Sequence, residues 1–264
     1  MKALIVMPTY NERENITPIV EEILRSAPQV DILIVDDHSP DGTGEIADAL
    51  RERIPNIAVL HREGKLGLGT AYVAGFRYAL EHGYDLVFEM DADFSHDPRY
   101  LPTFLAEAEQ ADLVIGSRYV RGGGTPNWSL LRRFISGGGN LFARVVLGLP
   151  IKDATAGYRC YRREVLEALD LEGITSQGYA FQVELAYQAL NHGFRVREVP
   201  IIFIDRRVGK SKMSRKIFIE GFVYVLRARL SRFGKPAQPK SAKQAPGSLV
   251  TSAASDEQLS TTSR

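Results

Sequence analysis

Short apolar runs of strand length alternate with longer, helix-like segments through the first half of the chain. Four to eight apolar residues bounded by polar residues indicate a buried strand. Strand–helix alternation predicts a largely parallel sheet with right-handed crossovers, and therefore an α/β fold. Strands are predicted over residues 3–7, 32–35, 57–60, 87–90 and 113–115, and helices over about 15–26, 43–53, 70–81 and 99–110.

The run Val87–Met90 ends in two carboxylates, Asp91 and Asp93, separated by Ala92. Ligands of open α/β sheets bind beyond the carboxyl ends of the strands, so these side chains are predicted at the mouth of a cleft. Two close carboxylates repel unless a cation joins them, and Mg²⁺ or Mn²⁺ does this, commonly together with a substrate diphosphate. A solvated acidic turn or a helix N-cap is the alternative interpretation.

Polar residues also follow the other predicted strands. Each of them alone fits a solvated loop residue, but the carboxyl ends of parallel strands meet at one edge of a sheet. Their joint placement predicts a single site. The residues are Tyr10 and Glu12 after the first strand, Asp37 after the second, Lys65 after the third and Arg118 after the fifth.

Several classes of protein are disfavoured. Residues 8–12 contain no glycine, so the dinucleotide-binding fingerprint is missing, and the Gly-rich loop 64–69 lacks the Gly-Lys-Ser/Thr ending of a P-loop. The net charge of +1 argues against a nucleic-acid partner. The single cysteine, Cys160, excludes an internal disulfide framework and a cysteine-rich zinc site.

The two ends of the chain differ in character. The N-terminus enters a strand directly without a signal peptide, and no uninterrupted apolar run is long enough to span a bilayer, so a cytoplasmic protein is expected. Residues 235–264 are rich in Ser, Thr, Ala, Gln and Pro and lack aromatic residues, which predicts a disordered tail. We expect one domain over 1–234, ending in an amphipathic helix.

Two apolar segments are candidates for contact with a membrane. A helix from about Arg215 places an apolar stripe beside a basic cluster, which fits either an anionic membrane surface or a packed core. The second segment covers residues 130–147 and is interrupted by three consecutive glycines, 137–139. The stripe consists of Phe218, Phe222, Leu226 and Leu230.

Five motifs together resemble the inverting glycosyltransferases of family 2, over about residues 2–232. The part of this family that is most similar is the polyprenol (dolichol) phosphate mannose synthases, because of Asn127-Trp128 with Arg132, Arg133 and Ser136, and of Gly209-Lys210-Ser211-Lys212. The five motifs are Pro8-Thr9-Tyr10-Asn11-Glu12, Asp36-Asp37-x-Ser39-x-Asp41, Lys65-x-Gly67-Leu68-Gly69, Asp91-Ala92-Asp93 and Gly116-Ser117-Arg118-Tyr119.

The resemblance implies a GT-A nucleotide-sugar-binding fold and transfer of mannose from GDP-mannose to polyprenyl phosphate, with Mg²⁺ or Mn²⁺ as cofactor. Among the implied metal residues Asp91, Asp93 and Ser95, the last stands where relatives often carry Gln. Asp93, Arg118 and Arg132 are the implied catalytic residues, and Arg118, Arg132 and Ser136 would hold the acceptor phosphate. The implied donor-binding residues are Pro8, Tyr10, Glu12, Val35, Asp37, Lys65, Asp91, Ala92, Arg206 and Lys212.

The implied chemistry suits these residue types. A leaving diphosphate needs positive charge as its bond breaks, which a divalent ion or basic side chains supply. A phosphate monoester is mostly dianionic near neutral pH because its second pKa is about 6. It is already a nucleophile, so positioning by the planar, bidentate fork of arginine replaces a strong general base.

Two other functions remain open on the sequence. One is the same fold with UDP-glucose or another sugar nucleotide and another lipid acceptor; the other is a non-catalytic, sugar-nucleotide-binding scaffold subunit. The presence of Asp91, Asp93, Arg118 and Arg132 disfavours the scaffold. A peripheral place on the cytoplasmic face of the membrane is expected, and an integral-membrane partner is possible.

Overall fold

Seven strands form one sheet in the order β3-β2-β1-β4-β6-β5-β7. The computed structural model describes residues 1–174, 176, 178–204 and 215–232. All strand pairs are parallel except those of β6, which is antiparallel to β4 and to β5. The predicted α/β fold with a mostly parallel sheet is confirmed. The strands are β1 (Ala3–Thr9), β2 (Asp31–Asp36), β3 (Ile57–His61), β4 (Leu86–Glu89), β5 (Leu113–Ser117), β6 (Arg159–Arg162) and β7 (Val196–Pro200).

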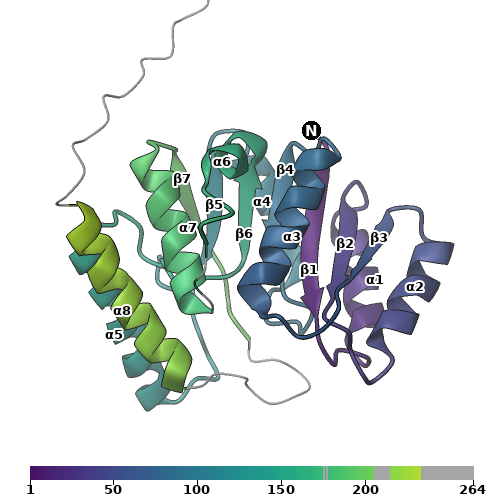
Figure 1. Ribbon diagram of the computed structural model, residues 1–264, viewed down its shortest axis with the longest axis horizontal. Helices are drawn as coiled ribbons and strands as arrows, with labels where there is room; N and C mark the ends of the chain where they lie inside the picture. Colours follow the sequence, from purple (N-terminus) through teal and green to yellow (C-terminus); the bar gives the residue numbers. More distant parts are fainter. Residues whose placement is uncertain (175, 177, 205–214, 233–264) are drawn as a thin grey trace, which may run out of the picture.

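Helices cover both faces of the sheet, giving three layers (Figure 1). One apolar core joins the sheet to α3, α5, α6, α7 and α8, and the other joins it to α1, α2 and α4. The helices are α1 (Ile16–Ser26), α2 (Thr43–Arg53), α3 (Leu68–Glu81), α4 (Leu101–Glu107, after a 3₁₀ turn at Pro98–Tyr100), α5 (Leu130–Leu147), α6 (Arg163–Ala168), α7 (Tyr179–Asn191) and α8 (Arg215–Arg232).

Strand β1 lies inside the sheet and is buried on both faces, which explains its unbroken apolar sequence. Leu4 and Val6 face the core under α3, whereas Ile5 and Met7 face the core under α1. Strands β2 and β3 are added on one side of β1, and the chain then crosses over to form β4 on the other side of β1. Such a reversal of strand order opens a crevice at the carboxyl ends of the strands, where ligands bind in this class of sheet.

The two apolar helices predicted as membrane candidates, α5 and α8, pack against each other beside α7 at one end of the sheet (Figure 1). Val225 and Ala228 turn toward the core, while Phe222, Leu226 and Leu230 of the predicted stripe are exposed. Phe218 and the predicted tail fall outside the side chains that the structure describes. No helix within the described ranges is long and apolar enough to cross a membrane.

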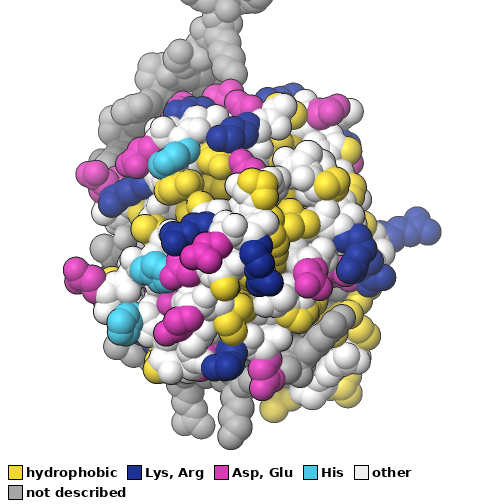
Figure 2. All heavy atoms as spheres, turned by 90° about the vertical axis from the view of Figure 1, so that its right-hand side faces the viewer, with side chains coloured by type: hydrophobic (Ala, Val, Ile, Leu, Met, Phe, Trp, Pro, Cys, Tyr) yellow, Lys and Arg dark blue, Asp and Glu magenta, His cyan; other side chains and the backbone are white. Residues whose placement is uncertain are grey.

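At the opposite end of the sheet, the face formed by α2 and β3 carries acidic, basic and histidine side chains interspersed with one another (Figure 2). Asp48 of α2 contacts both Arg51, at 3.1 Å, and His61 of β3, at 3.0 Å. This face therefore does not form the basic surface that a nucleic-acid partner would need.

The close contact of α3 with β1 predicts that Gly75→Ala destabilises the fold. A Cβ at Gly75 would lie 2.2 Å from Val6 Cγ1. Because the overlap is with a buried strand, we expect a loss of about 2 kcal/mol in the free energy of unfolding, measured by urea denaturation.

Gly138→Ala in α5 is the matched control, because a Cβ there meets no atom within 4 Å. Alanine is the better helix former, so this variant should gain up to about 1 kcal/mol. Equal free energies of unfolding for the two variants would contradict the packing argument.

Candidate active site

Asp91 and Asp93 lie in a tight turn after β4, at the carboxyl edge of the sheet. The Asp91 Oδ1 atom accepts a hydrogen bond of 2.9 Å from the Tyr72 hydroxyl, and the Asp91 N–H donates to His96 Nδ1 over 3.0 Å. The Asp93 Oδ1 atom accepts from the Ser95 N–H, also over 3.0 Å. The predicted pair of carboxylates is thus built into a rigid turn at the crevice.

The donor set of this turn fits a hard divalent cation. Carboxylate and hydroxyl oxygens are the ligands that Mg²⁺ prefers, and the hydrogen bonds just described come from a phenol and a backbone N–H, which cancel no charge. Among the described residues, no group of three His, Cys, Asp or Glu side chains could hold a metal by itself. A bound ion would therefore complete its shell with substrate oxygens and water.

Tyr72 and His96, which fix this turn, are both neutral. Burial, and then the charge of Asp91, raise the pKa of Tyr72 well above its ordinary value. Burial likewise lowers the pKa of His96, although the charges of Asp91 and Asp93 oppose the shift. Because His96 Nδ1 accepts a hydrogen bond, the proton of the neutral ring is on Nε2. Neither residue was found from the sequence: Tyr72 is 19 residues from Asp91, and His96, although close in the chain, belongs to none of the motifs.

The ends of β1 and β2 form the other side of the crevice. Pro8 and Val35, two of the residues predicted to bind the nucleotide, are partners in the register of β1 and β2. The Lys65 ammonium lies 4.1 Å from the centre of the Tyr10 ring, a cation–π contact that joins two of the predicted residues. These contacts bring residues of the first, second and third strand ends into one place.

Arg62 is a site residue that the sequence analysis missed. Its Nη1 atom lies 2.8 Å from Asp37 Oδ1, and both side chains are largely buried. Burial raises the pKa of Asp37 above its ordinary value, against the opposing charge of Arg62. Arg62 directly follows β3, so the rule that found Lys65 could have found it too. Its Nη2 atom also donates to Thr70 Oγ1 over 2.7 Å, which ties the start of α3 to Asp37 through Arg62.

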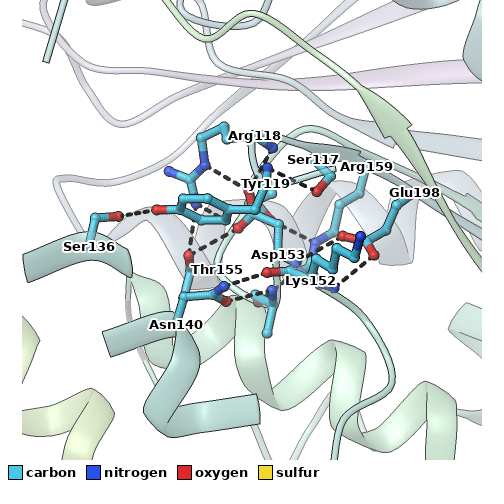
Figure 3. A network of polar contacts seen from close by, with 12 residues as sticks. Ser117, Arg118, Tyr119, Ser136, Asn140, Lys152, Asp153, Thr155, Arg159 and Glu198 are labelled. Carbon is cyan, nitrogen blue, oxygen red and sulfur yellow. Dashed lines mark hydrogen bonds and ion pairs between the residues drawn. The ribbon is translucent and has the colours of Figure 1, made fainter. Parts of the chain in front are cut away.

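Arg118 is held in a buried ion pair with Asp153, a residue that the sequence analysis did not place in the site (Figure 3). Asp153 accepts hydrogen bonds of 2.7 Å from both Nε and Nη2, and the Thr155 hydroxyl accepts from Nη2 over 2.8 Å. Burial alone would raise the pKa of Asp153, but the charge and hydrogen bonds of Arg118 outweigh it and lower the pKa.

Trp128 brings the two predicted acceptor arginines together. The guanidinium carbon of Arg132 lies 4.2 Å from the centre of an indole ring of Trp128, and that of Arg118 lies 5.6 Å away. Ser136, one turn further along α5, shares a hydrogen bond of 3.0 Å with the Tyr119 hydroxyl (Figure 3). Arg118, Arg132 and Ser136 therefore lie along one wall, formed by the end of β5 and the start of α5.

A largely apolar pocket of about 70 Å³ adjoins this wall between α5, α7 and α8. Ser136, Asn140 and Thr155 form its polar part, and Phe142, Val183, Phe222 and Val225 contribute much of its apolar lining. An anion held on the arginine wall would thus have an apolar cavity beside it.

The remaining predicted site residues make local contacts, are buried, or lie outside the described residues. Glu12 accepts a hydrogen bond of 2.8 Å from the Asn15 side chain, and its N–H donates to Thr43 Oγ1. Ala92 and Ser95 are buried within the turn. Arg206 and Lys212 lie outside the described residues.

Comparison with known proteins identifies the family. The sequence profile of glycosyl transferase family 2 matches residues 4–170. The chain belongs to glycosyl transferase family 2. It is 49% identical over 227 residues to an undecaprenyl-phosphate mannosyltransferase of Micrococcus luteus, covering 86% of this chain and 93% of the relative. It is also 49% identical over 237 residues to a polyprenol monophosphomannose synthase of Mycolicibacterium smegmatis, covering 88% and 89%.

Solved structures agree on the fold of this glycosyltransferase. A glucosyl-3-phosphoglycerate synthase of Mycobacterium tuberculosis, in complex with Mn²⁺, UDP and its product, superposes with a TM-score of 0.61 at 20% identity, over 89% of this chain and 81% of that one. A mannosyl-3-phosphoglycerate synthase of Rubrobacter xylanophilus gives 0.59 at 20% identity, over 93% and 79%. The expected GT-A fold and membership of the family are confirmed.

The buried ion pair predicts a large and pH-dependent effect of Asp153→Asn. Removing one partner leaves the Arg118 charge buried without compensation, which costs about 3–5 kcal/mol of unfolding free energy at neutral pH. The pKa of Asp153 is lowered in the folded protein, so its contribution is present above its unfolded pKa and is lost as the pH falls through the folded value. The deficit of the variant should therefore shrink in acid.

Glu167→Gln is the control for this measurement, since the Arg163–Glu167 pair on α6 is half exposed. Such a pair contributes about 0.5 kcal/mol or less. The free energies of unfolding would be measured by chemical denaturation at several pH values. Equal losses in the two variants would refute the strongly stabilising role of the Arg118–Asp153 ion pair.

Proposed function

We propose that this enzyme transfers mannose, with inversion, from GDP-mannose to a polyprenyl phosphate at the cytoplasmic face of a membrane. The observation that carries the proposal is the arginine wall of Arg118 and Arg132, which lies at the start of an exposed apolar helix. An anion-binding wall beside apolar surface suits an acceptor that is a phosphate at one end and a lipid at the other. The names of the two relatives at 49% identity support the same acceptor and sugar.

The donor would lie along the carboxyl ends of β1 to β4. Its base and ribose would contact Pro8, Tyr10, Val35 and Asp37, and its diphosphate would reach the Asp91–Asp93 turn. Asp37 is already oriented by Arg62, so its carboxylate is set for hydrogen bonding to the nucleotide. Arg206 and Lys212 remain predicted contacts of the diphosphate.

The acceptor phosphate would be held by Arg118, Arg132 and Ser136. The described hydrogen bonds of Arg118 use Nε and Nη2, which leaves Nη1 as the atom proposed to bind an acceptor oxygen. A phosphate oxygen would then attack the anomeric carbon on the face opposite the diphosphate, and the bond from that carbon to the diphosphate would break. The dianionic acceptor needs no proton removed, so positioning replaces a general base.

The turn residues Asp91 and Asp93, with Ser95, would hold Mg²⁺ or Mn²⁺. Such an ion, when bound, supplies positive charge to the leaving diphosphate. Hydrogen bonds from the Tyr72 hydroxyl and the Ser95 N–H would keep the two carboxylates at the point where the diphosphate is proposed to end. The Mn²⁺ and UDP in the M. tuberculosis structure are consistent with a divalent ion in this fold.

The helices α5 and α8 are proposed to rest on the membrane. Exposed large apolar side chains are Leu130, Leu131, Phe134, Ile135, Leu141 and Val145 on α5, and Phe222, Val223, Leu226 and Leu230 on α8. A soluble surface rarely exposes so many together without a partner. An integral-membrane partner stays a prediction from the sequence.

The proposal is tested by transfer of radiolabelled sugar into an organic-extractable product. Purified protein and polyprenyl phosphate in detergent would receive GDP-mannose or UDP-glucose, each with Mg²⁺, Mn²⁺ or EDTA. We expect metal-dependent labelling from GDP-mannose. We expect Asp93→Asn to lower the rate at least about a hundredfold, because the divalent ion that would balance the charge of the diphosphate loses a carboxylate ligand.

Asp85→Asn, at the opposite edge of the sheet, is the control and should retain the wild-type rate, because the Asp85 carboxylate accepts a hydrogen bond from the Lys2 N–H, away from the crevice. Labelling from UDP-glucose alone would overturn the donor assignment. Full activity of Asp93→Asn, or labelling undiminished by EDTA, would overturn the metal assignment.

Membrane contact predicts that Phe134→Asp weakens binding to vesicles containing anionic phosphatidylglycerol. Phe134 is 80% exposed on α5, and loss of its apolar contact should lower the partition coefficient at least about tenfold. Ala49→Asp adds the same charge to α2, at the other end of the molecule, and should leave binding unchanged (Figure 1). Co-sedimentation measures both; equal losses would count against a membrane-facing α5.

A further inference from the structure

Asp91 is held at two separate points by residues that belong to no predicted motif for substrate contact. Tyr72, in the first half of α3, binds its carboxylate, and His96, five residues further along the chain, binds its backbone N–H. Tyr72 is 1% exposed and His96 is 3% exposed. A side chain and a main-chain atom of the same residue are thus fixed independently.

The Tyr72 ring has little freedom to move. It is stacked between Phe76, at a centroid distance of 6.2 Å, and Phe181 of α7, at 6.1 Å. Its hydroxyl therefore points to one place, which is the Asp91 Oδ1 atom at 2.9 Å. Because the phenol is neutral and binds one oxygen, it orients the carboxylate without cancelling its charge and leaves Oδ2 for another ligand.

The His96 ring is fixed in the same way by different neighbours. It is stacked on Tyr158 with a centroid distance of 5.0 Å and an angle of 13° between the rings, and its edge meets Phe203 at 6.1 Å. Its Nδ1 atom accepts the Asp91 N–H, so the path of the chain through the turn is set as well. The ring also lines a small cavity with Arg118, on the acceptor side.

We propose that Tyr72 and His96 are positioning residues that preset Asp91 for a divalent cation and the donor diphosphate before either arrives. This inference rests on the proposed function only in taking a metal-bound nucleotide as the ligand of the turn. Hydrogen bonds to one carboxylate oxygen and to the backbone N–H of a metal ligand restrict that residue before the metal binds. Less conformational entropy is then lost on binding. In this proposal the two residues act through their hydrogen bonds to Asp91.

The test is a titration of the full-length protein with Mn²⁺ in the presence of GDP, followed by the loss of the free-ion signal in electron paramagnetic resonance. Tyr72→Phe removes the hydroxyl and keeps the ring between Phe76 and Phe181. We expect its apparent Mn²⁺ affinity to fall about tenfold, the range found for partners of metal ligands. The apparent KM for the polyprenyl phosphate should stay unchanged.

Tyr84→Phe is the matched control. The Tyr84 hydroxyl donates to Asp31 Oδ2 over 2.8 Å at the other edge of the sheet, so the same tyrosine–aspartate hydrogen bond is lost away from the site. Its Mn²⁺ affinity should equal that of the wild type. Wild-type affinity in Tyr72→Phe, or an equal fall in both variants, would overturn the inference.

The hydrogen bonds that Tyr72 and His96 make with Asp91 are called the clamp. Two variants of His96 distinguish its hydrogen bond from simple packing of its ring. In His96→Asn the amide oxygen can take the place of Nδ1, so Mn²⁺ affinity should stay within about threefold of the wild type. In His96→Gln the amide lies one carbon further out, and affinity should fall about tenfold, as for loss of a partner of a metal ligand. Equal Mn²⁺ affinities in folded Asn and Gln variants would contradict the role of Nδ1.

A parallel titration with UDP keeps this test separate from that of the proposed function. Mn²⁺ binding by the wild type with UDP and not with GDP would reject the proposed donor, and the clamp would be judged from the same variants with UDP. Failure of the wild type to bind Mn²⁺ with either nucleotide would reject both the metal assignment and the clamp.

Discussion

The proposed acceptor side of this enzyme depends on the buried ion pair between Arg118 and Asp153. Asp153 accepts hydrogen bonds from the Arg118 backbone as well as from its guanidinium. Glu198 of β7 in turn accepts the N–H groups of Lys152 and Asp153, at 2.7 and 2.8 Å. Two buried charges are costly unless each is matched, so these bonds fix the end of β5, the segment around Asp153 and β7 relative to one another.

The same segment also places the apolar helix α5. The Asn140 side chain donates to the carbonyl of Lys152 and accepts the N–H of Ala154, so the helix is held to the segment that holds Arg118 (Figure 3). Ser136 and Arg132 are carried on that helix. The charge of one buried aspartate thereby fixes the position of Arg118 relative to the exposed apolar surface of α5, which is the geometry that the proposed lipid-phosphate acceptor needs.

The donor side is organised differently, by neutral donors and aromatic packing around a turn. Behind that turn lies a second buried carboxyl, Glu89 at the end of β4, which accepts hydrogen bonds from Tyr161 and Gln182. Burial raises the pKa of Glu89 to about 7, although the nearby charge of Arg159 opposes this. The enzyme thus keeps a carboxyl group inside its core behind the turn, and pairs it with hydrogen-bond donors from β6 and α7.

The sequence by itself determined the first five strands and the four helices between them, the edge of the sheet where polar residues follow those strands, and the Asp91–Asp93 turn, because apolar periodicity and strand ends are local properties of the chain. Strands β6 and β7 and helices α6 and α7 were not among the bounded predictions. Arg62 was within reach of the same rule. Only the tertiary structure decided that Asp153 neutralises Arg118 and that Tyr72 orients Asp91, since these partners are 35 and 19 residues apart and no local pattern links them. It also decided that Phe222, Leu226 and Leu230 of α8 are exposed, because burial depends on which neighbours a helix finds.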